Sequence, residues 1–492
     1  MPRLPDHYRD FVVPQDAGMY FTITALAELL KSSQAPNLLK YFGAIDVFIE
    51  ETPNQHLPFL PEPSKVAKGK KHRYKNRKLS KRYDVCLPGF ASRPNEITWQ
   101  TELLRELLQA NARVLCIAEI NTPQWQSFEK CLAGNPTRSP QNGSSLIDIE
   151  EESVSAQEQG DMRAIRDWRL FHGILEPLGL HIKSTAYDLF SHVSLMSVIW
   201  EKLLSSVQIR SLVVRNNHAP ENSAATIIAK NLGIWVFTFQ HSVLSSMPSI
   251  CPTFADIVYS HGQTSRSILE KFSIASCGFE PEYRSIGMWN QPDIHLVPDF
   301  ASRRILLLDQ ECDWSKRYYG NAKSYSVLYE AVGEILRRQP TIRWRVRLHF
   351  DNDRRELWDK LALKFPGQLE LSQANSKTLT EDLKEVSLVT GLFSTAVCEA
   401  AKLGYPVIFI NEPEWFYTPD LVDFDAVTMS LNEFSKQCPG ILNDKALYDI
   451  IRNSSTNSAS RYYFSRRKGL GTVVQDIINM AFDGGYSQAR DF

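Results

Sequence analysis

The segment Val389–Ile410, VTGLFSTAVCEAAKLGYPVIFI, carries the clearest fold signal in the chain. A predicted strand ends at Gly391, and a helix then begins at Ser394 or Thr395. Alanines in this helix allow it to pack close to a sheet, and Gly404 ends it before the next predicted strand. This strand–helix–strand order is typical of a parallel sheet that is covered by helices.

The same alternation extends in both directions from this segment. Further predicted strands lie at 83–90, 113–120, 211–215, 235–239, 255–260, 283–287, 303–308, 343–350 and 368–372. Predicted helices lie at 97–110, 162–206, 223–232, 264–272, 324–338, 353–364 and 379–384, and residues 134–161 are predicted to be a flexible insertion. Strands that alternate with helices indicate parallel sheets, so we predict an α/β protein with two Rossmann-like lobes.

The chain has 492 residues, too many for one hydrophobic core, and is therefore divided into three parts. Residues 1–82 form an N-terminal extension, with a predicted helix at 22–30, a predicted strand at 45–49 and a basic linker. The first lobe spans 83–295 and the second spans 296–492, with a hinge predicted within 291–302. The final ~80 residues are predicted to be helical, with one helix returning to the first lobe.

Composition excludes several classes of protein. Hydrophobic residues make up 43% and charged residues 23%, as in ordinary globular proteins, and the net charge of −1 gives no general attraction to nucleic acid. The eight cysteines form no C-x-x-C pair, which favours free thiols in a reducing compartment. The N-terminal residues lack the apolar core of a secretory signal. We therefore expect a cytoplasmic protein.

One local excess of charge stands out from this average. Residues 65–82, KVAKGKKHRYKNRKLSKR, contain ten Lys or Arg and no acidic residue. Three interpretations are considered: a solvated linker, electrostatic contact with anionic lipid headgroups or a charged polysaccharide, and contact with nucleic acid. The second would place the protein at the inner face of the cell membrane as a peripheral protein, and we expect no nucleic acid partner.

The second lobe offers the residues suited to phosphate. The helix start at Ser394 and Thr395 presents unpaired backbone N–H groups and a partial positive charge. Arg347 and His349 end a predicted strand, at the edge of an open sheet where ligands gather. The alternatives are an ordinary capped helix and a strand end with solvated charges.

In the first lobe, polar residues follow three predicted strands. They are Glu119, then Asn216, Asn217 and His218, then Gln240 and His241. A histidine or a carboxylate at this edge could act as general base, so His241 and Glu119 are the candidate catalytic residues. The others are candidates for the acceptor side of a cleft. A structural role for a single histidine stays the competing interpretation.

Other site classes lack their motifs. The sequence contains no G-x-x-x-x-G-K-[ST], no G-x-S-x-G and no G-x-G-x-x-G, which argues against P-loop phosphoryl transfer, serine hydrolysis and nicotinamide binding. No dense His/Cys cluster indicates a metal. We expect neither a metal nor a cofactor.

The order of segments over residues 205–412 resembles bacterial proteins of the glycosyltransferase B (GT-B) fold that build surface carbohydrates. These are capsule polysaccharide transferases, sialyl- and Kdo-transferase-like enzymes and CDP-glycerol glycerophosphotransferases. The resemblance rests on RNNHAPENSAATIIAKNLGIWVFTFQHS at 215–242, ADIVYSHGQTSRSILEKF at 255–272, VRLHF at 346–350 and LFSTAVCEAAKLGYPVIFI at 392–410. Ser242 and Phe350 stand where the family usually has Gly and Pro, which leaves room for a catalytically silent member.

The resemblance implies a metal-independent glycosyltransferase that uses a nucleotide-sugar donor, first a CMP-sugar, and a polysaccharide or glycolipid acceptor. By position, His349, Ser394 and Thr395 would bind the donor phosphate, Glu399 would approach the ribose, and His241 would face the acceptor or the reacting carbon. The alternatives are transfer of a polyol phosphate from a CDP donor, and a silent scaffold that binds a glycan or an assembly partner. An epimerase would need several carboxylates, of which Glu119 is one candidate.

Overall fold

A computed structural model of the chain defines its architecture. It describes residues 38, 49–50, 82–89, 94–133, 144–175, 181–182, 187–215, 220–240, 254–273, 281–287, 294–309, 322–349, 355–374, 376–392, 394–410, 424, 427–462 and 466–482. The predicted helix at 22–30 and nearly all of the basic segment 65–82 lie outside these ranges.

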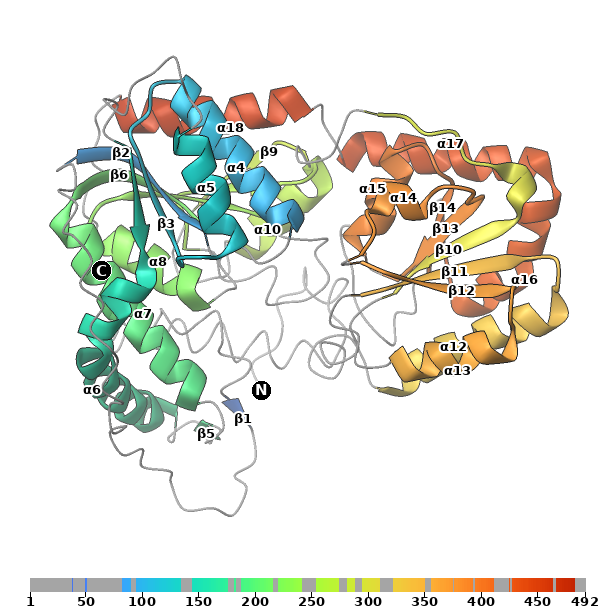
Figure 1. Ribbon diagram of the computed structural model, residues 1–492, viewed down its shortest axis with the longest axis horizontal. Coiled ribbons are helices and arrows are strands. Elements are labelled where there is room, and N and C mark those ends of the chain that lie inside the picture. Colours follow the sequence, from blue (N-terminus) through green and yellow to red (C-terminus); the bar gives the residue numbers. More distant parts are fainter. Residues whose placement is uncertain are drawn as a thin grey trace.

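The first lobe is built on a parallel sheet with helices packed around it (Figure 1). Within the described ranges this sheet has seven strands, in the order β4-β3-β2-β6-β7-β8-β9. Its strands are β2 (Arg82–Gly89), β3 (Val114–Ala118), β4 (Ser145–Asp148), β6 (Gln208–Val213), β7 (Trp235–Phe239), β8 (Ile257–Ser260) and β9 (Glu282–Ser285). Its helices are α4 (Pro94–Gln109), α5 (Pro123–Ala133), α6 (Ile149–Leu175), α7 (Tyr187–Ser206), α8 (Pro220–Asn231) and α10 (Gln263–Ser273). β1 (Ile49–Glu50) pairs antiparallel with β5 (His181–Ile182) beside it.

The second lobe repeats this design with a parallel sheet of six described strands, in the order β12-β11-β10-β13-β14-β15. Its strands are β10 (Arg304–Leu308), β11 (Arg343–Leu348), β12 (Leu369–Gln373), β13 (Leu388–Gly391), β14 (Val407–Ile410) and β15 (Thr428–Met429). Its helices are α12 (Ala322–Arg338), α13 (Arg355–Lys364), α14 (Leu379–Asp382), α15 (Thr395–Lys402), α16 (Leu431–Asn443) and α17 (Lys445–Tyr462), and a 3-10 turn, η5 (Phe300–Ser302), precedes β10. The predicted α/β architecture of two parallel-sheet lobes is confirmed.

Burial on both faces explains why the strand segments are almost continuously apolar. In β2, Val85 and Leu87 pack into the core on one face of the sheet, while Cys86 packs into the core on the other. Successive side chains of a strand point to opposite faces, so a strand covered on both sides needs apolar residues throughout. All four residues of β14 are buried in the same way.

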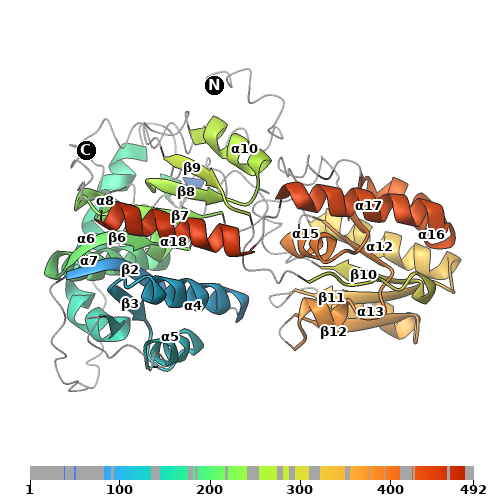
Figure 2. The same cartoon turned by 90° about the horizontal axis from the view of Figure 1, so that it is seen from above.

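The terminal helix α18 (Arg466–Phe482) returns to the first lobe, as predicted, and lies against β2 and β6 (Figures 1 and 2). Val473 and Ile477 are fully buried in the first-lobe core. The Asp476 carboxylate accepts a hydrogen bond of 3.0 Å from the Tyr259 hydroxyl and forms an ion pair with Arg284. The preceding helix, α17, packs on the second lobe, so the C-terminal segment joins the two halves.

The segment that enters the second lobe is fixed to the end of α15. The Leu296 N–H donates to the Leu403 carbonyl over 2.7 Å, and the His295 ring covers Gly404. Gly404 has a φ of +99°, and a Cβ there would lie 2.2 Å from the ring. A glycine is therefore required for this contact on both backbone and steric grounds.

The expected flexible insertion at 134–161 is wrong for its second half. Residues 145–148 form strand β4 at the edge of the first sheet, and α6 begins at Ile149. β4 is short and Leu146 is its one buried residue, so its apolar signal is weak. The acidic run Glu150–Glu152 occupies the first turn of α6, where negative charge favours a helix.

None of the helices within the described ranges is both long and apolar enough to cross a membrane.

Replacing Ile477 with alanine tests whether α18 is an integral part of the first lobe. Ile477→Ala leaves a cavity in a fully buried core position, so the free energy of unfolding should fall by about 2–5 kcal/mol. Urea unfolding measures the change, and Gln475→Ala, at an exposed position of the same helix, is the control. Equal stability of both variants would show that α18 is not packed in the core.

Candidate functional site

Each sheet reverses its strand order at one point, and such a switch point is where open α/β sheets form a ligand crevice. In the second sheet the chain runs from β10 outward to β11 and β12, then crosses to β13 on the other side of β10. The switch point thus lies at the carboxyl ends of β10 and β13, beside Asp309 and Gly391. The candidate residues Arg347, His349, Ser394 and Thr395 all lie at this edge of the sheet.

A glycine at the end of β13 permits the close packing of α15. A Cβ on Gly391 would lie 2.8 Å from Cγ2 of Val397 in α15 and 3.1 Å from the carbonyl oxygen of Leu308 in β10. Ser394 is the N-cap of α15, with its hydroxyl accepting from the Ala396 N–H over 3.3 Å. The helix N-terminus is therefore held beside the switch point, as the phosphate hypothesis requires.

Arg347 is engaged by the protein itself. Its guanidinium forms an ion pair with Asp382, at the end of α14, and donates to the Ala374 carbonyl over 3.4 Å. Asp382 is completely buried, and its second carboxylate oxygen accepts a hydrogen bond of 2.6 Å from Ser372. His349, one residue beyond β11, is half-buried.

Glu399 lies four residues after Thr395, on the same half-buried face of α15. Burial raises the pKa of its carboxyl from 4.5 to about 7, although the nearby charge of Arg347 acts in the opposite direction. A carboxyl with this pKa exists in both protonation states near neutral pH. It can donate a hydrogen bond as well as accept one.

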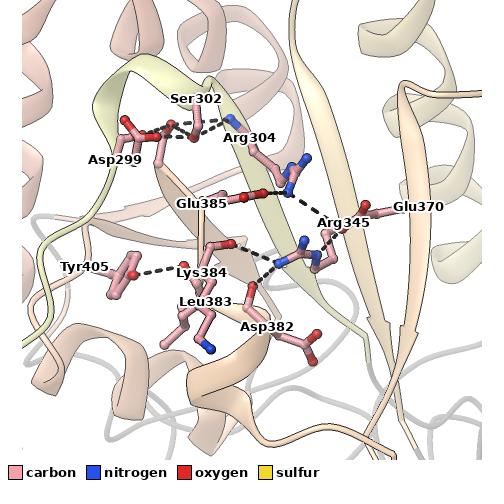
Figure 3. A network of polar contacts seen from close by, with 11 residues as sticks. Asp299, Ser302, Arg304, Arg345, Glu370, Asp382, Leu383, Lys384, Glu385 and Tyr405 are labelled. Atoms are coloured by element: carbon pink, nitrogen blue, oxygen red, sulfur yellow. Dashed lines mark hydrogen bonds and ion pairs between the residues drawn. The ribbon is translucent and has the colours of Figure 1, made fainter.

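A second arginine of β11, Arg345, lies two residues before Arg347 and at the centre of a polar network (Figure 3). Arg345 pairs with Glu370 of β12 and donates to the carbonyls of Asp382, the last residue of α14, and of Lys384, two residues later. Tyr405 donates to the next carbonyl of this turn, that of Leu383, over 2.8 Å. The network fixes α14, and with it the carboxylate that holds Arg347.

In the first lobe, the switch point lies between β2 and β6. The predicted residues Asn216, Asn217 and His218, which follow β6, lie outside the described residues, and so does His241. Their placement stays a prediction.

Gln240, at the end of β7, is buried and occupied by contacts within the protein. Its side-chain carbonyl accepts from the His261 N–H over 2.9 Å, and its amide group donates to the Ser265 hydroxyl over 3.4 Å. These bonds join the ends of β7 and β8. The predicted contact of Gln240 with an acceptor stays a prediction.

The structure adds His261 to the candidate residues at the carboxyl edge of the first-lobe sheet. It follows β8 in the sequence Ser-His-Gly, is buried next to Gln240, and has its pKa lowered by burial to about 3. Its imidazole is therefore neutral at physiological pH. A histidine directly after a predicted strand was a usable sequence signal, equal to that of His241.

Glu119 lies apart from this part of the first-lobe edge. It is exposed and follows β3, and β2 and β6 separate that strand from β7. Three strand spacings place the two strand ends about 14 Å apart. The structure thus does not bring Glu119 next to the end of β7.

No group of His, Cys, Asp or Glu side chains in the described ranges is arranged to hold a metal ion. The expectation of a metal-free site also rests on the interpretation that the sequence lacks an Asp-x-Asp pair, and that interpretation is wrong. The sequence contains two such pairs, Asp351 with Asp353 and Asp423 with Asp425, and all four aspartates lie outside the described ranges.

Comparison with known proteins finds solved structures that share this architecture. No family model matches the sequence, and no curated protein matches it. A solved structure of UDP-GlcNAc 2-epimerase from Neisseria meningitidis bound to UDP-GlcNAc is similar, with a TM-score of 0.50 at 12% identity over 81% of this chain and 99% of that one. The chain has a two-lobed, GT-B-like fold.

Two further solved structures are similar at lower scores. MurG from Acinetobacter baumannii has a TM-score of 0.45 at 12% identity, over 81% of this chain and 100% of that one. An O-GlcNAc transferase from Thermobaculum terrenum has a TM-score of 0.46 at 12% identity, over 99% of this chain and 78% of that one.

The close approach at Gly391 predicts the effect of a single methyl group. Gly391→Ala should push α15 away from β10 and β13, and lower the free energy of unfolding by about 1–3 kcal/mol. Urea unfolding measures this loss. Gly333→Ala on α12, where the nearest atom is the end of the Leu361 side chain at 3.2 Å, is the control, and an equal effect at both positions would contradict the prediction.

The raised pKa of Glu399 predicts a pH dependence of stability. Between pH 4.5 and about 7 the folded state binds more protons at this site than the unfolded state, so wild type loses stability as pH rises through that window. Relative to Glu399→Gln, the free energy of unfolding of wild type should fall by about 1–3 kcal/mol across this window. A fully buried carboxyl would give a larger change, but Glu399 is half-buried. Urea unfolding of both proteins from pH 4 to 8.5 measures it, and a constant difference would contradict the prediction.

Proposed function

We propose that the chain is a glycosyltransferase that binds a nucleotide-sugar at the switch point of its second lobe. One observation carries the proposal. Because Gly391 has no side chain, α15 packs closely against β10 and β13, and its N-terminus lies at the carboxyl ends of these strands. A helix terminus at this location is suited to an anionic group, and phosphate is the anion that every nucleotide-sugar carries.

The surrounding side chains supply the remaining contacts of a nucleotide. Ser394 and Thr395 add hydroxyl groups at the helix start, and His349 adds a ring nitrogen from β11. Glu399, one turn further along α15, presents a carboxyl suited to the hydroxyls of a ribose. As the bond to the sugar breaks, the helix terminus would stabilise the charge that develops on the departing phosphate.

The acceptor is proposed to bind at the first lobe. His241 would act as general base on an acceptor hydroxyl, from a position fixed by the hydrogen bonds of Gln240. Glu119 stays the second candidate for the general base, and Asn216, Asn217, His218 and Gln240 would form the acceptor side. A polysaccharide or glycolipid is the proposed acceptor, and residues 65–82 would hold the protein at a membrane that carries it.

The names of the similar structures support the use of a nucleotide-sugar, because they include transferases and an epimerase bound to UDP-GlcNAc. They do not distinguish between donors. Our first proposal stays a CMP-sugar, and CDP-polyol transfer is the alternative that leaves a phosphodiester product. Ser242 and Phe350, where the related family has Gly and Pro, favour a silent scaffold as the second candidate.

Nucleotide binding is the first test of this function. One of CMP, CDP, UDP, GDP and dTDP, at about 100 times its dissociation constant, should stabilise the protein by about 2.7 kcal/mol. Thermal unfolding measures the shift, which His349→Ala should reduce strongly because it removes a phosphate contact. His172→Ala, on α6 of the first lobe, is the control and should keep the shift.

The outcomes separate the candidates. A shift that His349→Ala leaves intact would place the nucleotide elsewhere. If none of the five nucleotides stabilises the protein, the transferase proposal fails and the silent scaffold takes its place. Given a shift, incubation with the matching nucleotide-sugar and analysis of the products distinguish transfer, epimerisation and phosphodiester formation.

A further inference from the structure

Arg347 forms an ion pair with one carboxyl group and acts on the charge of a second. It forms its ion pair with Asp382, the last residue of α14. It is also close enough to Glu399 of α15 for its charge to lower the pKa of that group. No ion pair joins Arg347 to Glu399 within the described residues.

The preference for Asp382 is built into the second sheet. Asp382 has no exposed surface, and Ser372 of β12 donates a hydrogen bond of 2.6 Å to its other oxygen. The α14 turn is in turn held by Arg345, which binds the carbonyls of Asp382 and Lys384. A buried carboxylate with two such partners, one for each oxygen, is held in place.

We propose that Asp382 is a positioning residue that holds the Arg347 guanidinium on the α14 side of the switch point, so that Glu399 stays unpaired and available to a ligand. Ser372 is the second member of this device, because it orients the Asp382 carboxylate. The inference rests on the proposed function for the identity of that ligand, a nucleotide whose ribose hydroxyls meet Glu399. The positioning itself can be measured without any ligand.

Other charged groups lie on the elements that pack against α15 or at the same sheet edge. Of the packed elements, β13 and β14 carry no charged residue, and α17 carries Lys445, Asp449, Arg452 and Arg461. The others are Lys402 on α15 itself, Arg347 on β11, Asp382 on α14 and Asp309 after β10. Arg452 donates to the Gly404 carbonyl at the opposite end of α15, and Lys402 lies three residues beyond Glu399. Arg347 is the one whose charge acts on Glu399 in the structure. A change of its partner should therefore be felt at Glu399.

The test compares the pH dependence of unfolding in two backgrounds. Urea unfolding from pH 4 to 8.5 is measured for wild type and Glu399→Gln, and again for Asp382→Asn and the double variant. In each background the difference between the two proteins reports the ionisation of Glu399. The neutral side chain of Asp382→Asn no longer forms the ion pair, so Arg347 can pair with Glu399 instead. The pH range over which the difference in free energy of unfolding decreases should then move down by about one pH unit or more.

Glu370→Gln provides the matched control. It removes the partner of Arg345, two residues before Arg347 on the same face of β11. The window should not move in that background. If Asp382→Asn does not fold, Ser372→Ala loosens the same carboxylate, and it should move the window in the same direction by a smaller amount.

An unchanged window in the Asp382→Asn or Ser372→Ala background would overturn the proposal, and so would an equal movement with Glu370→Gln. These measurements contain no nucleotide, so their outcome is independent of whether any nucleotide binds. If one does bind, its affinity measured across pH should show the same displacement in Asp382→Asn.

Discussion

The ion pair between Arg347 and the fully buried Asp382 is the interaction on which the second-lobe site depends. An unpaired charge at this depth would cost several kcal/mol, so each group requires the other. The pair exists because β11 alternates, with Trp344 and Leu348 packed in the apolar core and Arg345 and Arg347 at the alternate positions. A short helix then covers the arginines with its carboxylate and its terminal carbonyls.

The same constraint couples distant parts of the lobe. Arg345 ties β11 to β12 through Glu370 and to the end of α14 through two carbonyls (Figure 3). The loop after α14 leads directly into β13, which ends at Gly391 and positions α15. A change in the pairing of one arginine therefore reaches the helix start proposed to bind phosphate.

Local patterns in the sequence predicted the sheets, because buried parallel strands are apolar along their whole length. The helix start at Ser394 was predicted too, since Gly391, a capping serine and Gly404 are local signals. Asp382 was not found. It lies in the polar sequence Leu-Thr-Glu-Asp, typical of a solvated turn, and its partner Arg347 is 35 residues away. Which buried charges pair depends on the order of the strands in the sheet, and local sequence patterns do not reveal that order. For the same reason, the sequence did not separate Glu119 from the end of β7.

The charge balance at the switch point bears on the donor. Arg347 and Asp382 neutralise each other, and the raised pKa of Glu399 limits the negative charge of that carboxyl near neutral pH. An ionised Glu399 would repel a phosphate bound one turn away, so the protonated form is the one that suits an anionic ligand. With Arg347 committed to Asp382, the phosphate contacts that we propose are the N-terminus of α15 and His349. Because this proposed set consists of one helix terminus and one side chain, a nucleoside monophosphate donor is the first that we would test.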